Sequence, residues 1–123
     1  MKALIAVAIV LTAAGADAQT LLQQFPSCDL RAQRALKGEM GGAIKDPRQA
    51  HILMRADIVQ ADLGNAAKAG RITRTAGNGL FKRVQTVRTG ADRYTGKQGF
   101  LSAAEAASYD RSLDDVAMRI CRP

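Results

Sequence analysis

A catalytic site in this chain of 123 residues would have to be built around one histidine, His51. A serine hydrolase needs such a histidine to take the proton from the attacking hydroxyl. Four serines lie beyond position 18, but Ser27 and Ser102 stand where helix caps are expected, and no nucleophile-elbow motif is present. Asp114 and Asp115 are adjacent, so on a helix they point about 100° apart, which is poor geometry for paired carboxylates. The sequence therefore predicts no catalytic residue and no enzyme.

The beginning of the chain has the pattern of an export signal. Lys2 is followed by the apolar run Ala3–Leu11 and by Ala16-Asp17-Ala18, which places small residues where a signal peptidase cuts. A membrane anchor would need about 20 apolar residues, and this run ends sooner. We therefore expect residues 1–18 to be a signal peptide cleaved before Gln19, and residues 19–123 to form one periplasmic or secreted domain.

The two cysteines are best explained by this export. Cys28 and Cys121 have no Cys-x-x-Cys spacing, and His51 has no second histidine or cysteine spaced to join it as a metal ligand. In an oxidising compartment a cysteine pair forms a disulfide more often than a metal site. We expect a Cys28–Cys121 disulfide that ties the two ends of the domain, a His51 that is packed or at the surface, and no metal or cofactor.

Helical periodicity runs through the whole exported part, with almost no strand pattern. Four helices are expected, at about 27–37, 47–69, 74–94 and 103–119. Apolar residues at 4-3-4-3 spacing form a seam on each of the last three. These residues are Ile52, Ala56, Val59, Leu63 and Ala66, then Leu80, Val84, Val87, Ala91 and Tyr94, then Ala106, Tyr109, Leu113, Val116 and Ile120. The fold class is all-α: a small bundle of three to four antiparallel helices, with its ends clasped by one disulfide.

A motif at the helix joints occurs twice, 29 residues apart. Gly70–Thr73 and Gly99–Ser102 each combine a glycine that can end a helix, an apolar residue and a hydroxyl side chain that can cap the next helix. Glu105 completes a capping box with Ser102. We interpret residues of about 70–98 and 99–121 as two copies of one helical repeat.

The second joint also resembles the last half of an EF-hand loop. Gly99, Leu101, Ser102 and Glu105 match that family, whereas Tyr94, Gly96 and Gln98 stand where its oxygen ligands belong. Calcium needs six or more oxygen ligands. The resemblance therefore implies at most a degenerate ion sensor that has kept the turn.

The two joints with their following helices also resemble small exported helical proteins of Gram-negative bacteria, which carry repeated Gly-x-Leu-Ser/Thr helix starts. The matching segments cover roughly half of the exported chain. This resemblance implies a periplasmic location, a helical architecture and a role in regulation.

The formal charge of +7 is concentrated in residues 68–97, where eight basic residues stand against Asp92. The rest of the exported chain has nine basic and nine acidic residues. Candidates for binding an anion or a partner are Lys82, Arg83, Arg88, Arg93 and Lys97. The alternative is that these side chains only solvate a helix. Export and the absence of interleaved aromatic residues argue against a nucleic-acid partner.

Elimination and the focused charge lead to a ranked expectation of function. The first is a non-enzymatic periplasmic protein that acts by protein contact, as a regulator or accessory of an envelope partner. The alternative is a binder of an anionic envelope component, such as lipid phosphate or an acidic polymer, through segment 68–97. The third is the degenerate ion sensor. No stable membrane insertion of the exported chain is expected.

Overall fold

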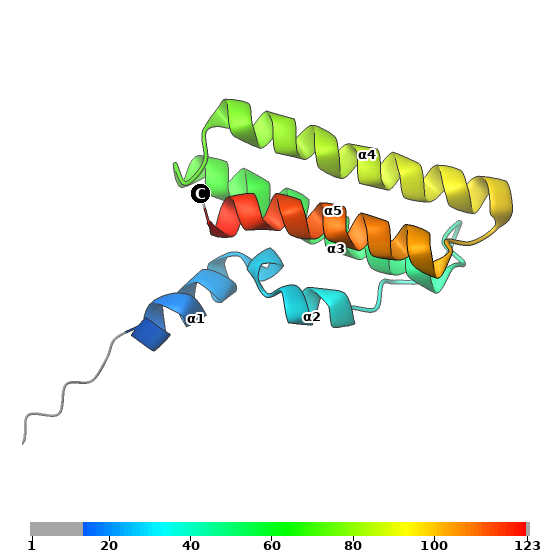
Figure 1. Cartoon of the computed structure of the whole chain (residues 1–123), viewed down its shortest axis with the longest axis horizontal. Helices are drawn as coiled ribbons and strands as arrows, with labels where there is room; N and C mark the ends of the chain where they lie inside the picture. Colours follow the sequence, from blue (N-terminus) through cyan, green and yellow to red (C-terminus); the bar gives the residue numbers. More distant parts are fainter. Residues whose placement is uncertain (1–13, 123) are drawn as a thin grey trace, which may run out of the picture.

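The computed structural model describes residues 14–122, so most of the predicted signal peptide, 1–18, lies outside the described residues. The elements in chain order are helix α1 (Ala14–Gln24), 3-10 turn η1 (Pro26–Cys28) and helices α2 (Leu30–Ala35), α3 (Pro47–Lys68), α4 (Arg74–Gln98) and α5 (Ala103–Cys121). α3, α4 and α5 form a bundle in which α4 runs antiparallel to both α3 and α5, and α1, η1 and α2 lie along the side formed by α3 and α5 (Figure 1). The predicted all-α bundle is confirmed, and no strand occurs between residues 14 and 122.

The helix starts form where the sequence predicts them because each has a capping side chain. The carboxylate of Asp46 accepts a hydrogen bond from the backbone N–H of Gln49, and Pro47 occupies the first turn of α3. Thr73 caps α4 in the same way, and Ser102 and Glu105 form the reciprocal capping box of α5. Local chemistry thus sets the register of all three bundle helices.

The helix ends correct two of the predicted boundaries. α4 continues to Gln98 instead of stopping at Tyr94, because Gly99 is the residue that takes the left-handed conformation, with φ of 86°. α5 continues from the predicted end at 119 to Cys121. Tyr94, which was predicted to belong to the apolar seam, is 41% exposed.

The core of the bundle consists of the three predicted seams without Tyr94, and Leu101 and Phe25 are added to them. Its buried members include Ile52, Val59, Leu63, Leu80, Val84, Val87, Leu113, Val116 and Ile120. Tyr109 is only partly buried and packs against Gly90, where an added Cβ would lie 2.3 Å from the tyrosine hydroxyl oxygen. Gly90 therefore allows the close approach of α4 to α5.

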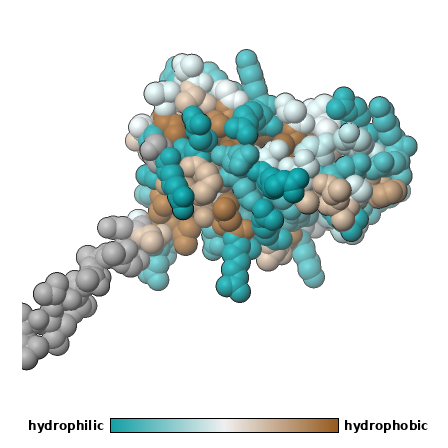
Figure 2. All heavy atoms as spheres, viewed as in Figure 1, coloured by the Kyte–Doolittle hydropathy of each residue, from teal (hydrophilic) through white to brown (hydrophobic). Residues whose placement is uncertain are grey.

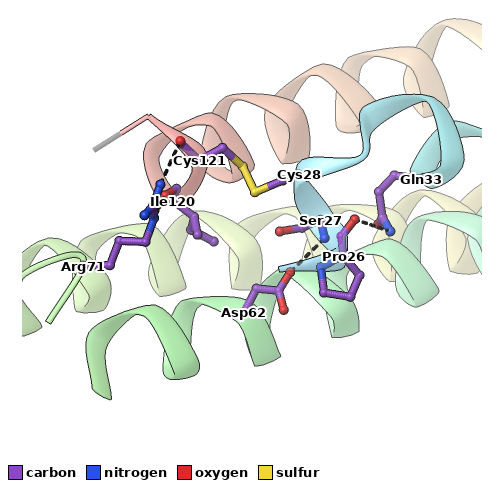
Figure 3. Close-up of a disulfide and its surroundings, with 8 residues drawn as sticks. All are labelled: Pro26, Ser27, Cys28, Gln33, Asp62, Arg71, Ile120 and Cys121. Atoms are coloured by element: carbon purple, nitrogen blue, oxygen red, sulfur yellow. Dashed lines mark hydrogen bonds between the residues drawn. A yellow bond between two sulfur atoms is a disulfide. The ribbon is translucent and has the colours of Figure 1, made fainter. Parts of the chain in front are cut away.

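The prediction of a first helix capped by Ser27 is wrong. Asp29 caps the short α2 by accepting from the backbone N–H of Ala32 at 3.0 Å. Ser27 is instead fully buried in η1, and its backbone N–H donates to the carboxylate of Asp62 on α3 at 2.8 Å (Figure 3). Ser27 therefore does not cap a helix. The hydrogen bond from its backbone N–H to Asp62 of α3 instead anchors η1 to the bundle.

The predicted disulfide is present. Cys28 at the end of η1 is bonded to Cys121 at the end of α5, with the two Cα atoms 5.8 Å apart (Figure 3). The bond joins the segment before the bundle to the last turn of its last helix. Together with the bond from Ser27 to Asp62, it fixes η1 against both α3 and α5.

Candidate functional site

The five basic residues that the sequence singled out on α4 are not equivalent in the structure. Lys82, Arg93 and Lys97 are exposed, and their side chains have no hydrogen bond or ion pair among residues 14–122. Arg83 is half exposed and lies 3.9 Å from the carboxylate of Asp115 on α5. These four residues make up what we call the α4 outer face.

Arg88, the fifth candidate, takes part in the contact between α3 and α4. Its guanidinium pairs with the carboxylate of Asp57 and also donates to the side-chain oxygen of Gln60 at 3.2 Å. Its side chain is only 22% exposed. Arg88 is therefore placed to hold two helices together, and we do not include it in the α4 outer face.

The one acidic residue of segment 68–97 lies away from the α4 outer face. The carboxylate of Asp92 accepts from the side-chain amide of Gln49 on α3 at 2.9 Å. Because Asp92 is turned toward α3, the positive charge of Lys82, Arg93 and Lys97 is not neutralised locally. Such a surface attracts an acidic partner over a distance of about one Debye length, roughly 8 to 10 Å at physiological salt.

A second charged region, which the sequence analysis missed, lies between α2, α3 and α5. Arg55 of α3 is fully buried and donates to Asp110 and Asp114 of α5, both at 2.6 Å. Arg34 of α2 pairs with Asp114 from the solvent side, and His51 lies 2.9 Å from Asp110. We call these five residues the buried charge cluster.

The signal for this cluster was present in the sequence. Arg55 falls three residues after Ile52 and four before Val59, so a charged residue interrupts an apolar face and needs partners. Asp110 and Asp114 are four residues apart, so they lie on the same side of α5 and both reach one guanidinium. In the sequence the adjacent pair Asp114-Asp115 is more conspicuous than this spacing of four residues.

His51 is held by acceptors on both sides of its ring. Nδ1 lies 2.6 Å from the carbonyl oxygen of Leu36, and Nε2 lies 2.9 Å from a carboxylate oxygen of Asp110. A carbonyl oxygen and a carboxylate accept hydrogen bonds, so this geometry favours the protonated ring, in which both nitrogens donate. The hydrogen bond to Asp110 is the largest effect and raises the pKa of His51. Burial of the ring opposes this shift, and the smaller effect of the hydrogen bond to Leu36 adds to it.

The same hydrogen bonds affect the pKa of Asp110 and the availability of the His51 ring nitrogens. Burial alone would raise the pKa of Asp110, but hydrogen bonds from His51 and Arg55 outweigh it, so its pKa is lowered. With both nitrogens of His51 already bonded, this ring has no free nitrogen for general-base chemistry. The His51–Asp110 pair therefore holds α2, α3 and α5 together.

We expect this pair to make stability fall as the solution becomes alkaline. A pKa that is raised on folding gives stability that is complete below about pH 6.5, the unfolded value, and that is lost as pH rises through the folded pKa. The melting temperature of the wild type should therefore be higher at pH 5.5 than at pH 8.5. Circular dichroism melts of wild type and His51→Gln over this range measure the effect. Equal pH dependence of the two proteins would contradict it.

The joint that resembles an EF-hand uses its matching carboxylate for structure. Glu105 accepts from the backbone N–H of Ser102 and from the side-chain amide of Gln98, both at 2.8 Å. Among residues 14–122 no group of three or more His, Cys, Asp or Glu side chains is arranged to hold a metal ion. The carboxylate that would close a calcium loop is thus engaged in capping α5.

Comparisons with known proteins add no assignment. No family model, no curated protein and no solved structure matches this chain. None of the helices between residues 14 and 122 has both the length and the apolar character needed to cross a bilayer. The function must therefore be argued from the side chains themselves.

Proposed function

We propose that this chain is a non-enzymatic exported protein that acts by contact with an acidic surface of an envelope partner, through the α4 outer face. The observation that carries the proposal is the set of cations Lys82, Arg93 and Lys97, exposed and without a partner among the described residues. Arg83 extends the set toward α5. An arrangement spread along a convex helix suits a protein surface, because it offers no enclosed space for a small substrate.

Three further observations support a role without catalysis and outside the cytoplasm. The only histidine has both ring nitrogens bonded. The ends of the folded part are joined by a disulfide, a bond that persists in oxidising compartments. The amino-terminal pattern is that of an export signal. The role of regulator or accessory is our proposal for what this contact does.

Site-specific photo-crosslinking in intact cells tests the proposal. A crosslinker at Thr89, which is exposed on α4 between Lys82 and Arg93, should give a discrete crosslinked species. The same crosslinker at Arg111, exposed on α5, is the matched control. The species should disappear in a Lys82→Gln/Arg93→Gln/Lys97→Gln variant. Identical patterns from both positions, or no effect of the charge changes, would refute the contact.

An anionic envelope component is the second candidate, because the α4 outer face could also meet lipid phosphate or an acidic polymer. Co-sedimentation with anionic vesicles separates the two functions. Vesicle binding that weakens with salt and is lost in the triple variant, without any protein crosslink from Thr89, would replace the protein partner by a lipid or polymer surface. A crosslinked protein without vesicle binding would support the first proposal.

A further inference from the structure

The hollow between the start of α4 and the end of α5 combines basic side chains with apolar ones. Its volume is about 390 Å³, within the range typical of small-ligand sites. The residues around it are Arg71, Ile72, Thr73, Ala76, Leu80, Arg119 and Arg122. Three of these are arginines, and none is acidic.

Arg71 is the fixed member of this set. Its Nε donates to the carbonyl oxygen of Ile120 at 2.6 Å and its Nη2 to that of Cys121 at 3.0 Å (Figure 3). The guanidinium also lies over the ring of Phe25, at 5.7 Å from the centroid. Of its five N–H groups these bonds use two, so three remain for a ligand. A charged donor that is already held in place loses little entropy when it binds an anion.

The other two arginines supply charge without a neutralising partner. Arg119 and Arg122 have no hydrogen bond or ion pair from their side chains among residues 14–122, and both residues are exposed. In the sequence they belong to the part outside segment 68–97, which carries no net charge. The fold brings them to the same hollow as Arg71, which is about 50 residues away along the chain.

Apart from Thr73, the remaining residues around the hollow are apolar. Leu80 is buried in the core, Ile72 is partly buried against it, and Ala76 adds a methyl group from the first turn of α4. Figure 2 shows apolar atoms between hydrophilic side chains at the left end of the molecule, which in Figure 1 is the end where α4 begins and α5 finishes. The site thus has a cationic rim beside an apolar wall.

Two neighbouring hollows lack this combination. The one on α4 that includes Arg93 is otherwise lined by Gln85, Thr86, Thr89 and Gly90, without an apolar side chain of useful size. The one between α3 and α4 that includes Phe81 has one arginine, Arg74, and nothing that selects an occupant. Of these three hollows, only the one at the end of α5 has both three arginines and an apolar surface.

We propose that this hollow binds a small amphipathic anion, with its carboxylate or phosphate headgroup on Arg71, Arg119 and Arg122 and its alkyl chain against Ile72 and Leu80. The headgroup oxygens would accept from the free N–H groups of the guanidinium ions, which match carboxylate and phosphate geometry. The alkyl chain would cover apolar surface that now faces water. This site is separate from the α4 outer face and does not depend on the proposed protein contact.

Isothermal titration calorimetry of the exported, disulfide-bonded protein tests the site with decanoate and decyl phosphate, both below the concentrations at which they form micelles. We expect saturable binding of at least one of these probes to one site. Acetate lacks the chain and decyltrimethylammonium has the opposite charge, so each should bind at least about tenfold more weakly. The tighter of the two anionic probes identifies the headgroup.

Two variants address the site without touching the structural bonds of Arg71. Arg119→Gln/Arg122→Gln removes two charges and should weaken binding by about tenfold. Ala76→Glu puts a carboxylate on the wall and should weaken it similarly. This second variant keeps the fold, because position 76 is three residues after the cap Thr73 and would complete a capping box like that of Ser102 and Glu105.

The matched control is Lys82→Gln/Arg93→Gln, which changes the net charge by the same amount outside the hollow. Its affinity for the probes should equal that of the wild type. The proposal is overturned if neither anionic probe binds, if decyltrimethylammonium binds as tightly, or if the control variant loses as much affinity as Arg119→Gln/Arg122→Gln. Absence of a crosslink from Thr89 in the otherwise unchanged protein, by contrast, would count against the protein contact alone.

Discussion

Replacing both cysteines by serine is expected to lower the free energy of unfolding by about 4 to 5 kcal/mol, the largest effect of any change we consider. The bond between Cys28 and Cys121 closes a loop over a sequence separation of 93 residues. In the chain-entropy description, a cross-link over such a loop removes many conformations of the unfolded chain. Urea denaturation followed by circular dichroism measures the change.

Reduction of the wild type provides the control for this experiment. Wild-type protein in excess reductant should unfold at the same urea concentration as Cys28→Ser/Cys121→Ser without reductant, and reductant should not affect the variant. A loss below about 1 kcal/mol in both cases would mean that the unfolded chain is already restricted by other contacts.

The segment that loses most protection on reduction should be the one before the bundle. η1 is held by the disulfide on one side and by the bond from the Ser27 backbone N–H to Asp62 on the other. α3, α4 and α5 pack mainly against one another. Amide hydrogen exchange should therefore accelerate first around residues 25–36, while the centre of α4 stays protected.

The parts of this fold that the sequence predicted are those set by short-range chemistry. The caps Asp46, Thr73 and Ser102 and the left-handed Gly70 and Gly99 each act within a few residues, so their effect can be read from the chain alone. The apolar seams follow from the helical period. The disulfide was also predictable, since two cysteines allow one pairing.

The parts that the sequence did not predict depend on contacts between distant residues. Ser27 could cap a helix, but Asp62 of α3 binds its backbone N–H and draws it into the interior. Gly90 was not singled out because its partner, Tyr109, belongs to another helix. A single sequence without its spatial neighbours does not reveal such contacts.

The same distinction separates the basic residues. Lys82 and Arg88 carry the same charge in the sequence. In the structure Arg88 pairs with the carboxylate of Asp57 on α3, whereas Lys82 is exposed to solvent. Arg119 and Arg122 were assigned to a neutral frame, and the fold places them beside Arg71. The position of an anion site therefore depends more on which basic side chains lie close together in space than on how many of them are close together in the sequence.

Replacing Arg55 by methionine is expected to cost about 3 to 5 kcal/mol, because it leaves two carboxylates in a partly dry site without their buried cation. Arg55 is fully buried and is the only residue that binds both Asp110 and Asp114 from α3 among the described residues. Arg55→Lys should also be destabilising, since one ammonium group does not reproduce the two-pronged geometry of a guanidinium. Thermal and urea denaturation of both variants measure these losses.

Neutralising the carboxylates decides whether charge or packing causes the loss. Arg55→Met combined with Asp110→Asn and Asp114→Asn should regain much of the lost stability, because no carboxylate is then left without the buried guanidinium. The matched control is Arg88→Met, whose partner Asp57 is 64% exposed and whose ion pair should contribute no more than about 1 kcal/mol. If Arg88→Met cost as much as Arg55→Met, or if the combined variant were no more stable than Arg55→Met, the loss would come from packing and the buried charge cluster would not be the electrostatic link between α3 and α5.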